Sequence, residues 1–234
     1  MYILEGTIGA GKSTFLKLIS NYLAEAHVVM EPVNQWQKTT TGESILTYFY
    51  SDPHRWAYTM EMLTMRSRLQ EYLKQQQSPE LVIMERSFYS GCYVFAYNCY
   101  LSGYLTELEW KLYLEWLTFL TVNTCKTPRG FIYLSVTPEV AYERIKKRNR
   151  NGEDSMPLEY IQAINKRYID FLFNKNSIVP ELKDIPVLVL TCDEEFETNS
   201  KLMHTHAQAV IEFIKQTNTY PKIKHQTAFE SCTF

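Results

Sequence analysis

The chain has 234 residues, of which 45% are hydrophobic, and its formal net charge is −2. This length and apolar content fit a single domain with a full core. The small net charge excludes a broad basic surface of the kind that binds the backbone of long nucleic acids, so we expect no nucleic-acid partner.

Short apolar runs alternate with longer amphipathic runs along the chain. This pattern predicts an α/β fold in which about five parallel strands are flanked by helices. The predicted strands are Tyr2–Glu5, His27–Met30, Leu81–Glu85, Gly130–Ser135 and Val187–Thr191. The predicted helices are Lys12–Ala26, Gly42–Tyr50, Pro53–Gln77, Ser87–Ser102, Glu107–Cys125, Pro138–Asn149, Pro157–Asn174 and Ser200–Gln216. One domain is expected over residues 1–216, and the polar residues 217–234 are expected to form a loosely ordered tail.

The compartment is predicted from the cysteines and the first residues. Five cysteines are scattered without a metal-ligand spacing, which favours a reducing environment. The chain runs from Tyr2 directly into a glycine-rich segment, and no apolar run has the length of a membrane span. We therefore expect a cytoplasmic protein with no targeting peptide and no membrane partner.

The first predicted strand leads into a segment with the spacing of a phosphate-binding P-loop, and a helix follows. The segment consists of Gly6, Thr7, Ile8, Gly9, Ala10, Gly11, Lys12, Ser13 and Thr14. Its glycines allow backbone N–H groups to turn toward phosphate oxygens at the start of a helix. Lys12 is expected to reach the β- and γ-phosphates, and the Ser13 hydroxyl to bind Mg²⁺. A nucleoside triphosphate is the predicted ligand, and the missing Asn-Lys-x-Asp and Asp-x-x-Gly motifs make a GTPase a weak alternative.

Acidic residues follow the next two predicted strands. Glu31 comes after the second strand, at the edge of the sheet where open α/β folds bind ligands. A carboxylate there can accept the proton of a hydroxyl that attacks the γ-phosphate. Glu85 and Arg86 end the third strand, where Glu85 can hold the metal through water and Arg86 can neutralise phosphate charge. The alternative for this pair is a buried, purely structural ion pair.

Four motifs in this order resemble the deoxynucleoside kinase family, which includes the deoxycytidine, deoxyguanosine and mitochondrial thymidine kinases and the broad-specificity insect enzyme. They are the G-T-I-G-A-G-K-S-T loop, E-P-V followed by Trp36, E-R-S-F-Y-S-G-C-Y-V-F, and the arginine-rich R-I-K-K-R-N-R-N-G-E before P-L-E-Y. The resemblance extends from Tyr2 to about Gln216. It implies a P-loop kinase fold with a lid at about residues 144–155. The implied reaction is Mg²⁺-dependent transfer of the γ-phosphate of ATP to the 5′-hydroxyl of a deoxynucleoside, in nucleotide salvage for DNA precursor synthesis.

The resemblance also implies roles for residues around the acceptor. Glu31 would be the base near the 5′-hydroxyl, with Glu85 a second acidic candidate and Arg86 bridging the reacting oxygens. Tyr50 and Glu153 match family positions that hold the sugar 3′-hydroxyl. Trp36 and Met60 match positions that form the wall of the base pocket.

For the phosphate donor, the resemblance points to the predicted lid and to a loop near the end of the chain. Arg144 and Arg148 match lid arginines over the phosphates, with Arg150 close by. Without the family resemblance, the alternative interpretation of this basic run is a solvated helix end. Glu194, Glu195 and Phe196 align with a loop that contacts the adenine. The family further implies a homodimer through the aromatic-rich helices Ser87–Ser102 and Glu107–Cys125, which otherwise form an ordinary core.

Three positions depart from the family pattern in the region expected to read the base. Glu61 stands where the family has a glutamine, Arg68 matches the deoxycytidine and deoxyguanosine kinases, and Gly91 replaces an aspartate or alanine. An ionised Glu61 only accepts hydrogen bonds and Arg68 only donates them, which favours thymine or guanine. Gly91 would leave space for the thymine methyl group. The alternative is that Glu61 and Arg68 pair with each other and leave selectivity to the pocket's shape.

Two other functions remain open from the sequence. A nucleoside monophosphate kinase similar to thymidylate kinase shares the P-loop and lid, but it needs fixed cations for an acceptor phosphate where this chain has Glu31. A catalytically silent nucleotide-binding protein is the alternative from another class.

Overall fold

A computed structural model of the protein describes residues 1–33, 36, 44–150, 156–175 and 178–218. The described residues contain a parallel five-stranded sheet with strand order β2-β3-β1-β4-β5. Its strands are β1 (Tyr2–Glu5), β2 (Ala26–Val29), β3 (Leu81–Glu85), β4 (Phe131–Ser135) and β5 (Val187–Thr191). The predicted α/β fold with five parallel strands is confirmed.

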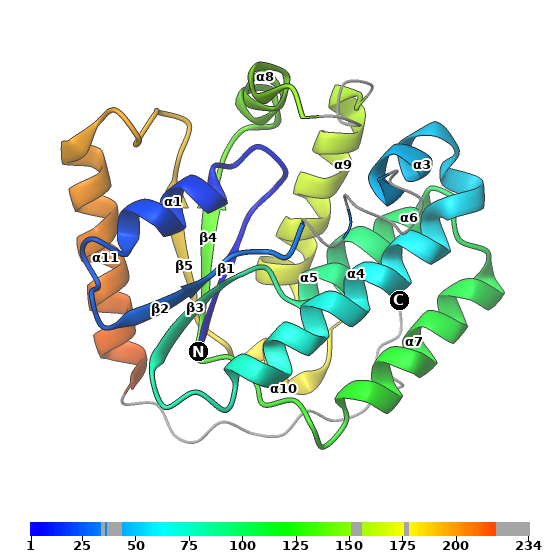
Figure 1. The fold of residues 1–234 in the computed structure, drawn as a ribbon, viewed down its shortest axis with the longest axis horizontal. Coiled ribbons are helices and arrows are strands. Elements are labelled where there is room, and N and C mark those ends of the chain that lie inside the picture. The colour runs from blue at the N-terminus through cyan, green and yellow to red at the C-terminus, as the bar shows by residue number, and fades with distance from the viewer. Residues whose placement is uncertain (34–35, 37–43, 151–155, 176–177, 219–234) are drawn as a thin grey trace.

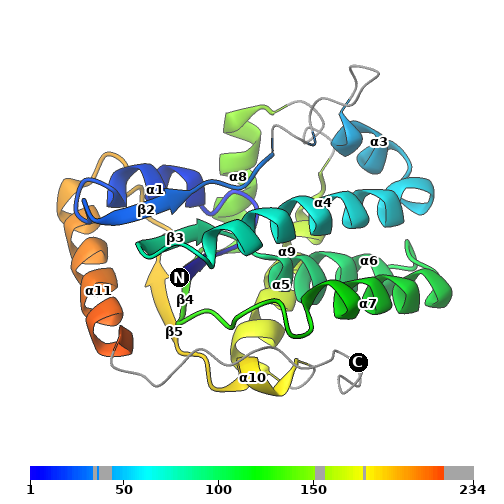
Figure 2. The ribbon, with the colours of Figure 1, turned by 60° about the horizontal axis from the view of Figure 1, so that its bottom comes forward.

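Helices cover both faces of this sheet (Figure 1). The helices with at least seven residues are α1 (Lys12–Ile19), α3 (Ile45–Ser51), α4 (Pro53–Gln75), α7 (Glu107–Thr121), α8 (Pro138–Arg148), α9 (Leu158–Ile169) and α11 (Ser200–Asn218). The shorter ones are α5 (Phe88–Ser90), α6 (Tyr97–Leu101), α10 (Pro180–Lys183) and the π-helical stretches η1 (Gly91–Ala96) and η2 (Asp170–Asn174). Figure 2 shows α4, α6 and α7 side by side.

The alternation of side chains along β1 explains why the core has two halves. Ile3 packs into a cluster with residues of α4, η1 and α7, whereas Tyr2 and Leu4 pack into a second cluster with α1 and α11. Successive side chains of a strand point to opposite faces, so an entirely apolar strand must be covered on both sides. All four residues of β1 are buried, and the last of them is the acidic Glu5.

Most predicted elements agree with the structure, with shifts at their ends. The first helix was predicted to reach Ala26, but α1 ends at Ile19 because a turn follows and Ala26 pairs with Leu81 in the sheet. The predicted helix Ser87–Ser102 is present as the consecutive segments α5, η1 and α6. The short helix α10 was not predicted.

The end of the chain differs slightly from the predicted boundary. α11 continues to Asn218, and Thr217, which was assigned to the tail, is buried with its hydroxyl 2.6 Å from that of Tyr2. Residues 219–234, which form the rest of the predicted tail, lie outside the described part. Within the described residues, we find no helix whose length and apolar character would let it cross a membrane.

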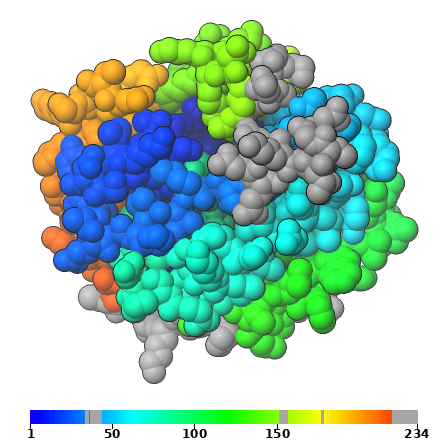
Figure 3. Space-filling view, in the orientation of Figure 1, coloured from blue at the N-terminus to red at the C-terminus, as the bar shows by residue number. Residues whose placement is uncertain are grey.

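The carboxyl edge of the sheet gathers the residues that the sequence selected. The P-loop follows β1, Glu31 follows β2, and Glu85 is the last residue of β3. Because β2, β3 and β1 are parallel neighbours, these three points meet at one edge. In Figure 3 the surface is hollowed where the dark-blue first residues meet the light-green helix α8.

Candidate active site

A cavity of about 220 Å³ opens at this edge of the sheet. Most of the predicted P-loop, acidic and base-pocket residues lie together on its wall. Of the P-loop, Gly6, Thr7 and Ala10 are buried and are not on the wall, and the other exceptions are described below. Its lining residues are Ile8, Gly9, Gly11, Lys12, Ser13, Thr14, Glu31, Val33, Trp36, Leu46, Phe49, Tyr50, Met60, Glu61, Thr64, Arg68, Glu85, Arg86, Phe95, Arg148, Arg150 and Tyr160. The mixed polar and apolar wall suits a small organic ligand.

The backbone of the P-loop requires glycine at two points. Gly9 has φ +82°, and a Cβ atom there would lie 2.3 Å from the carbonyl oxygen of Ala141. Gly11 has φ +85° and immediately precedes α1, so its left-handed conformation turns the chain into the helix. The loop therefore presents the N-terminus of α1 to the cavity, which is a suitable place for phosphate oxygens.

Lys12 lies buried at this end of the cavity. Its Nζ donates to the carbonyl oxygen of Thr7 at 2.7 Å. Burial lowers the pKa of Lys12 to about 7 and the charge of Arg86 acts in the same direction, against the opposing effect of Glu85 and Glu31. A phosphate anion near Nζ would restore the charge of this lysine.

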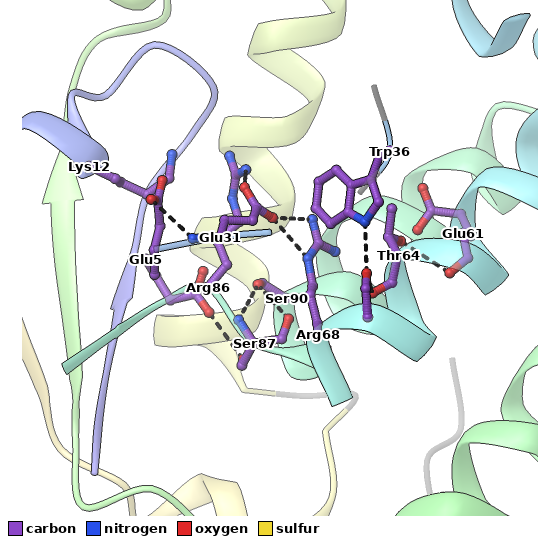
Figure 4. Close-up of polar contacts among 12 residues, drawn as sticks. Glu5, Lys12, Glu31, Trp36, Glu61, Thr64, Arg68, Arg86, Ser87 and Ser90 are labelled. Atoms are coloured by element: carbon purple, nitrogen blue, oxygen red, sulfur yellow. Dashed lines mark hydrogen bonds and ion pairs between the residues drawn. The ribbon is translucent and has the colours of Figure 1, made fainter. Parts of the chain in front are cut away.

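Glu31 is held between two arginines, as Figure 4 shows. Arg68 donates from Nε and Nη2 to Oε1 of Glu31, at 2.9 and 2.6 Å, and Arg86 donates from Nη1 to Oε2 at 2.7 Å. Burial would raise the pKa of Glu31, but the charges of Arg86 and Arg68 outweigh it and lower the pKa to about 2. Glu31 is therefore a fixed carboxylate at neutral pH.

Arg86 owes its position to an unusual backbone and to three side-chain contacts. Its φ is +56°, a left-handed conformation that costs a residue with a side chain free energy and is found at functional sites. Besides Glu31, its guanidinium donates to the hydroxyl of Tyr168 at 3.3 Å and to the carbonyl oxygen of Gly6 at 3.4 Å. Arg86 thus connects the P-loop with the carboxylate.

Glu5 and Tyr168 form a further layer behind Arg86. The Tyr168 hydroxyl donates to Oε2 of Glu5 at 3.1 Å, and the Ser87 hydroxyl donates to Oε1 at 3.3 Å. Burial raises the pKa of Glu5 to about 7, although Arg86 acts in the opposite direction. Neither residue was among the predicted site residues, although an acidic residue at the end of an otherwise apolar strand is a signal for Glu5.

The other end of the cavity is formed by Trp36 and α4. The indole Nε1 of Trp36 donates to Ser67 at 2.7 Å, and the guanidinium of Arg68 lies 5.2 Å from the ring centroid of Trp36. The Phe95 ring lies near both arginines, 5.3 Å from Arg68 and 4.9 Å from Arg86. These cation–π contacts orient the two arginines toward Glu31.

Glu61 lies on α4 on the other side of Arg68 from Glu31 (Figure 4). Its Oε1 lies 3.9 Å from the thiol sulfur of Cys99, while its Oε2 has no hydrogen-bond partner among the residues that the structure describes. The alternative that Glu61 pairs with Arg68 is not what the structure shows, because Arg68 donates to Glu31 instead. Burial raises the pKa of Glu61 to about 7, against the opposing charge of Arg68.

Gly91 has a different effect from the one expected. A Cβ atom at Gly91 would lie 3.0 Å from Nη1 of Arg68 and 3.8 Å from the Tyr113 hydroxyl. The space beside this glycine is therefore taken by Arg68, not left open for a thymine methyl group, and Gly91 is not part of the cavity wall. Its absence of a side chain allows Arg68 to approach η1 closely.

The predicted lid and donor-loop residues are divided between two places. Arg148 and Arg150 line the main cavity. Arg144 instead donates to the carbonyl oxygens of Cys192, Asp193 and Glu194 and pairs with Glu195 at 3.0 Å, next to a separate hollow beside α8. Residues 151–155 of the predicted lid, which include Glu153, lie outside the described residues.

Phe196 is the buried member of the predicted donor loop. Its ring packs edge-on against Phe15 at 5.7 Å and near His206 at 6.3 Å, and it lies 3.0 Å from where a Cβ of Gly11 would be. It therefore supports the end of the P-loop, and its 4% exposure leaves little surface for an adenine.

The residues predicted to hold Mg²⁺ fit that ion. The Ser13 hydroxyl lies 3.0 Å from each carboxylate oxygen of Glu85, so two kinds of oxygen ligand meet at the mouth of the P-loop. Within the described residues, no group of three His, Cys, Asp or Glu side chains forms a dedicated metal site. Mg²⁺ in phosphoryl-transfer sites needs only one or two protein oxygens, because phosphates and water complete its shell.

Comparisons with known proteins agree with this geometry. A family model described as deoxynucleoside kinase matches residues 2–215. The chain is 38% identical to a mitochondrial deoxyguanosine kinase of Xenopus laevis, over 84% of this chain and 83% of that protein. It is 34% identical to deoxycytidine kinase 2 of Gallus gallus, with the same coverage, and 32% identical to the mitochondrial thymidine kinase 2 of Homo sapiens, over 89% of this chain and 76% of that protein.

Proposed function

The chain belongs to the deoxynucleoside kinase family, and from this premise we propose that it transfers the γ-phosphate of ATP to the 5′-hydroxyl of a deoxynucleoside. The observation that carries the proposal is the carboxylate of Glu31 beside Arg86 and the P-loop, in one cavity. A hydroxyl acceptor needs a proton acceptor at this point, whereas a nucleotide acceptor, as in a monophosphate kinase, needs cations for its phosphate.

A strongly ionised Glu31 is compatible with this role. A carboxylate with a pKa of about 2 is a weak base, but phosphoryl transfer passes through a loose transition state in which the hydroxyl keeps its proton until late. Arg86 would turn part of its hydrogen bonding toward the transferred phosphoryl group. Glu31 would then lose some of the positive charge around it and gain basicity as the proton leaves the 5′-hydroxyl.

The donor phosphates are expected at the N-terminus of α1. Lys12 would contact the β- and γ-phosphates, and Arg148 and Arg150 would lie above them. Ser13 and Glu85 would hold Mg²⁺, directly or through water. When bound, Mg²⁺ neutralises developing phosphate charge and fixes the phosphate chain. For Arg144, the contacts with the loop of Cys192 suggest that it holds this loop near the adenine.

The sugar and base are expected between Tyr50, Met60 and Trp36, on the far side of Glu31 from the P-loop. Glu153 stays a predicted partner of the 3′-hydroxyl. Oε2 of Glu61 is buried and has no partner among the described residues, as expected for a group that awaits a ligand. Thymine and guanine offer an N–H next to a carbonyl oxygen, so thymidine or deoxyguanosine is the substrate that we propose at neutral and higher pH.

A homodimer is proposed through the outer face of α7. Leu108, Leu112, Trp116 and Phe119 form one apolar stripe on this face, and the exposed fraction of Phe119 is 76%. The opposite face of the same helix packs into the core through Trp110 and Tyr113. Apolar stripes of this kind mark protein interfaces, and a second copy would bury this one. Light scattering of the wild type and of Phe119→Glu tests it, since a wild-type monomer would contradict the proposal.

The activity is tested by coupled ATP turnover with Mg²⁺ and each of the four deoxynucleosides, with the four monophosphates in parallel. We expect turnover with a deoxynucleoside and a loss of about 10³-fold in kcat for Glu31→Gln, as for removal of a general base. Glu25→Gln, which changes an exposed carboxylate, is the matched control. Turnover only with monophosphates would favour the monophosphate kinase, and no turnover would favour a silent nucleotide-binding protein.

A further inference from the structure

Glu61 is a buried carboxyl group that forms no ion pair in the described part of the chain. No neighbouring cation therefore fixes its protonation state. Its exposed fraction is 5%, and it lines the cavity at the end where we propose the base binds. Arg68, the cation nearest in sequence on the same face of α4, is bound to Glu31 through Nε and Nη2. Glu61 therefore has a free oxygen toward the cavity and no fixed charge state.

The groups that surround Glu61 come from four elements. Arg68 acts on it from α4, Cys99 from α6, Tyr113 from α7 and Tyr160 from α9. Burial raises the pKa of the thiol and of both phenols well above their usual range, so these three stay neutral at physiological pH. Burial likewise raises the pKa of Glu61 to about 7, against the opposing charge of Arg68 and the opposing side-chain hydrogen bonds with Thr64 and Cys99. Glu61 is thus the group of this set that changes charge near neutrality.

The two forms of a carboxyl group present different hydrogen-bonding patterns. The ionised form offers two acceptors, whereas the protonated form offers one O–H donor and one acceptor, the same pair as a glutamine amide. Cytosine and adenine present a ring-nitrogen acceptor beside an amino donor and match the protonated form. Thymine and guanine present a ring N–H donor and match the ionised form.

We infer that the proton on Glu61 selects the nucleobase, so that the ionised protein prefers thymidine or deoxyguanosine and the protonated protein prefers deoxycytidine or deoxyadenosine. The inference rests on the proposed function, because it assigns the base to the end of the cavity at Glu61. It makes Glu61 a specificity-determining residue whose selectivity depends on pH.

The ratio of kcat/KM for two deoxynucleosides measures this effect directly. kcat/KM reports the ionisations of the free enzyme and of the substrate. Ionisations that both substrates need equally, such as that of Glu31, cancel in the ratio. If each base used only one form of Glu61, the ratio of thymidine to deoxycytidine would rise by about tenfold per pH unit. We expect a rise of at least about fivefold from pH 6.5 to pH 8.

Glu61→Gln is the matched variant, because glutamine keeps the donor and acceptor of the protonated acid and cannot ionise. We expect its thymidine to deoxycytidine ratio to stay constant between pH 6.5 and pH 8, close to the acidic limit of the wild type. A flat ratio in the wild type, or an equal slope in Glu61→Gln, would overturn the inference.

Binding calorimetry gives a second readout that does not depend on turnover. Titrations in two buffers of different ionisation enthalpy give the number of protons that accompany binding. Deoxycytidine should take up a proton at pH 8, thymidine should release one at pH 6.5, and Glu61→Gln should do neither. Binding of both without proton exchange would contradict the inference.

The two proposals fail in different ways. A protein that phosphorylates no deoxynucleoside at any pH contradicts the proposed function. An active kinase whose base ratio does not change with pH leaves the proposed function intact and contradicts only the role of Glu61.

Discussion

Glu31 and Glu61 are two buried carboxyl groups on the wall of one cavity, and they are in opposite states. Both oxygens of Glu31 accept hydrogen bonds from arginines, and its pKa is about 2. Glu61 leaves one oxygen without a partner in the described part of the chain, and its pKa is about 7. Burial is nearly the same for both, so the placement of Arg68 and Arg86 decides the difference.

The cavity therefore has a reaction end at Glu31 and a base end at Glu61. At the reaction end, the protein itself supplies the partners of Glu31, as suits a group that must be oriented before the substrate arrives. At the base end, Oε2 of Glu61 lacks a partner among the described residues, and a ligand in the cavity can supply one. The hydrogen-bond partners of a carboxyl group are thus supplied by the fold at the reaction end and by the substrate at the base end.

The largest effect is expected from Arg86→Lys, which breaks the reaction end. Lysine keeps the charge but cannot contact Glu31, Tyr168 and the carbonyl oxygen of Gly6 together. We expect kcat/KM to fall by about 10³-fold, since one fixed donor at a reacting centre contributes that much. Steady-state kinetics at constant pH measure it, with thermal unfolding to confirm a folded protein. A loss below tenfold would mean that only the charge of Arg86 matters.

Next in size is the effect of Glu61→Gln on stability, which removes the titrating group of the base end. Because the pKa of Glu61 is raised in the folded protein, its protonation stabilises the fold, and this stabilisation is fully present below the unfolded pKa of 4.5. It is lost as the pH rises through the folded pKa of about 7. The wild type should therefore lose about 3 kcal/mol relative to Glu61→Gln between pH 4.5 and pH 8, at about 1.4 kcal/mol per pKa unit. Glu5 titrates in both proteins and cancels.

Urea unfolding of both proteins at several pH values between 4.5 and 8 measures this difference. Glu80→Gln, an exposed carboxylate that precedes β3, is the control and should follow the wild type. A constant difference between wild type and Glu61→Gln over this range would show that Glu61 is already ionised below pH 5.

A smaller effect is expected from Arg68→Met, because Arg68 lies between the two ends. Its loss leaves Glu31 with Arg86 alone and removes the positive charge that opposes protonation of Glu61. We expect kcat/KM for thymidine to fall by about tenfold, in line with about 1.5 kcal/mol for a hydrogen bond to a charged group. Deoxycytidine should be less affected, because protonation of Glu61 becomes easier. An equal loss for both bases would place Arg68 at the reaction end only.

The smallest effect is expected from Tyr168→Phe. This change removes the hydroxyl that accepts a hydrogen bond from Arg86 and donates one to Glu5. It leaves every group that is proposed to touch the substrate in place. We expect kcat to fall about threefold with KM nearly constant, and stability to fall by about 1 kcal/mol. Tyr133→Phe is the matched control, because its hydroxyl contacts Asn165 and its ring lies 5.7 Å from that of Tyr168. Equal losses of kcat in both variants would make the role of Tyr168 purely structural.

The sequence alone determined the sheet and the reaction end. Apolar runs located five strands within one residue at each end, and the glycine spacing placed Lys12 and Ser13 at the start of a helix. These features depend on neighbours in the chain, so local patterns are sufficient to predict them. Because parallel strands end at one edge, the positions of Glu31, Glu85 and Arg86 at the carboxyl ends of their strands also predicted that they meet.

Which side chains pair depends on how elements far apart in the sequence pack together. Arg68 lies 37 residues from Glu31 and seven from Glu61, yet it binds the more distant one. Sequence spacing put Glu61 and Arg68 on one face of α4, but in the structure the guanidinium of Arg68 binds Glu31 and lies 5.3 Å from the centroid of the Phe95 ring. Gly91 acts through the same packing, since the space that it leaves is filled by Arg68. Such pairings depend on the distances between packed elements, which the order of residues along the chain does not contain.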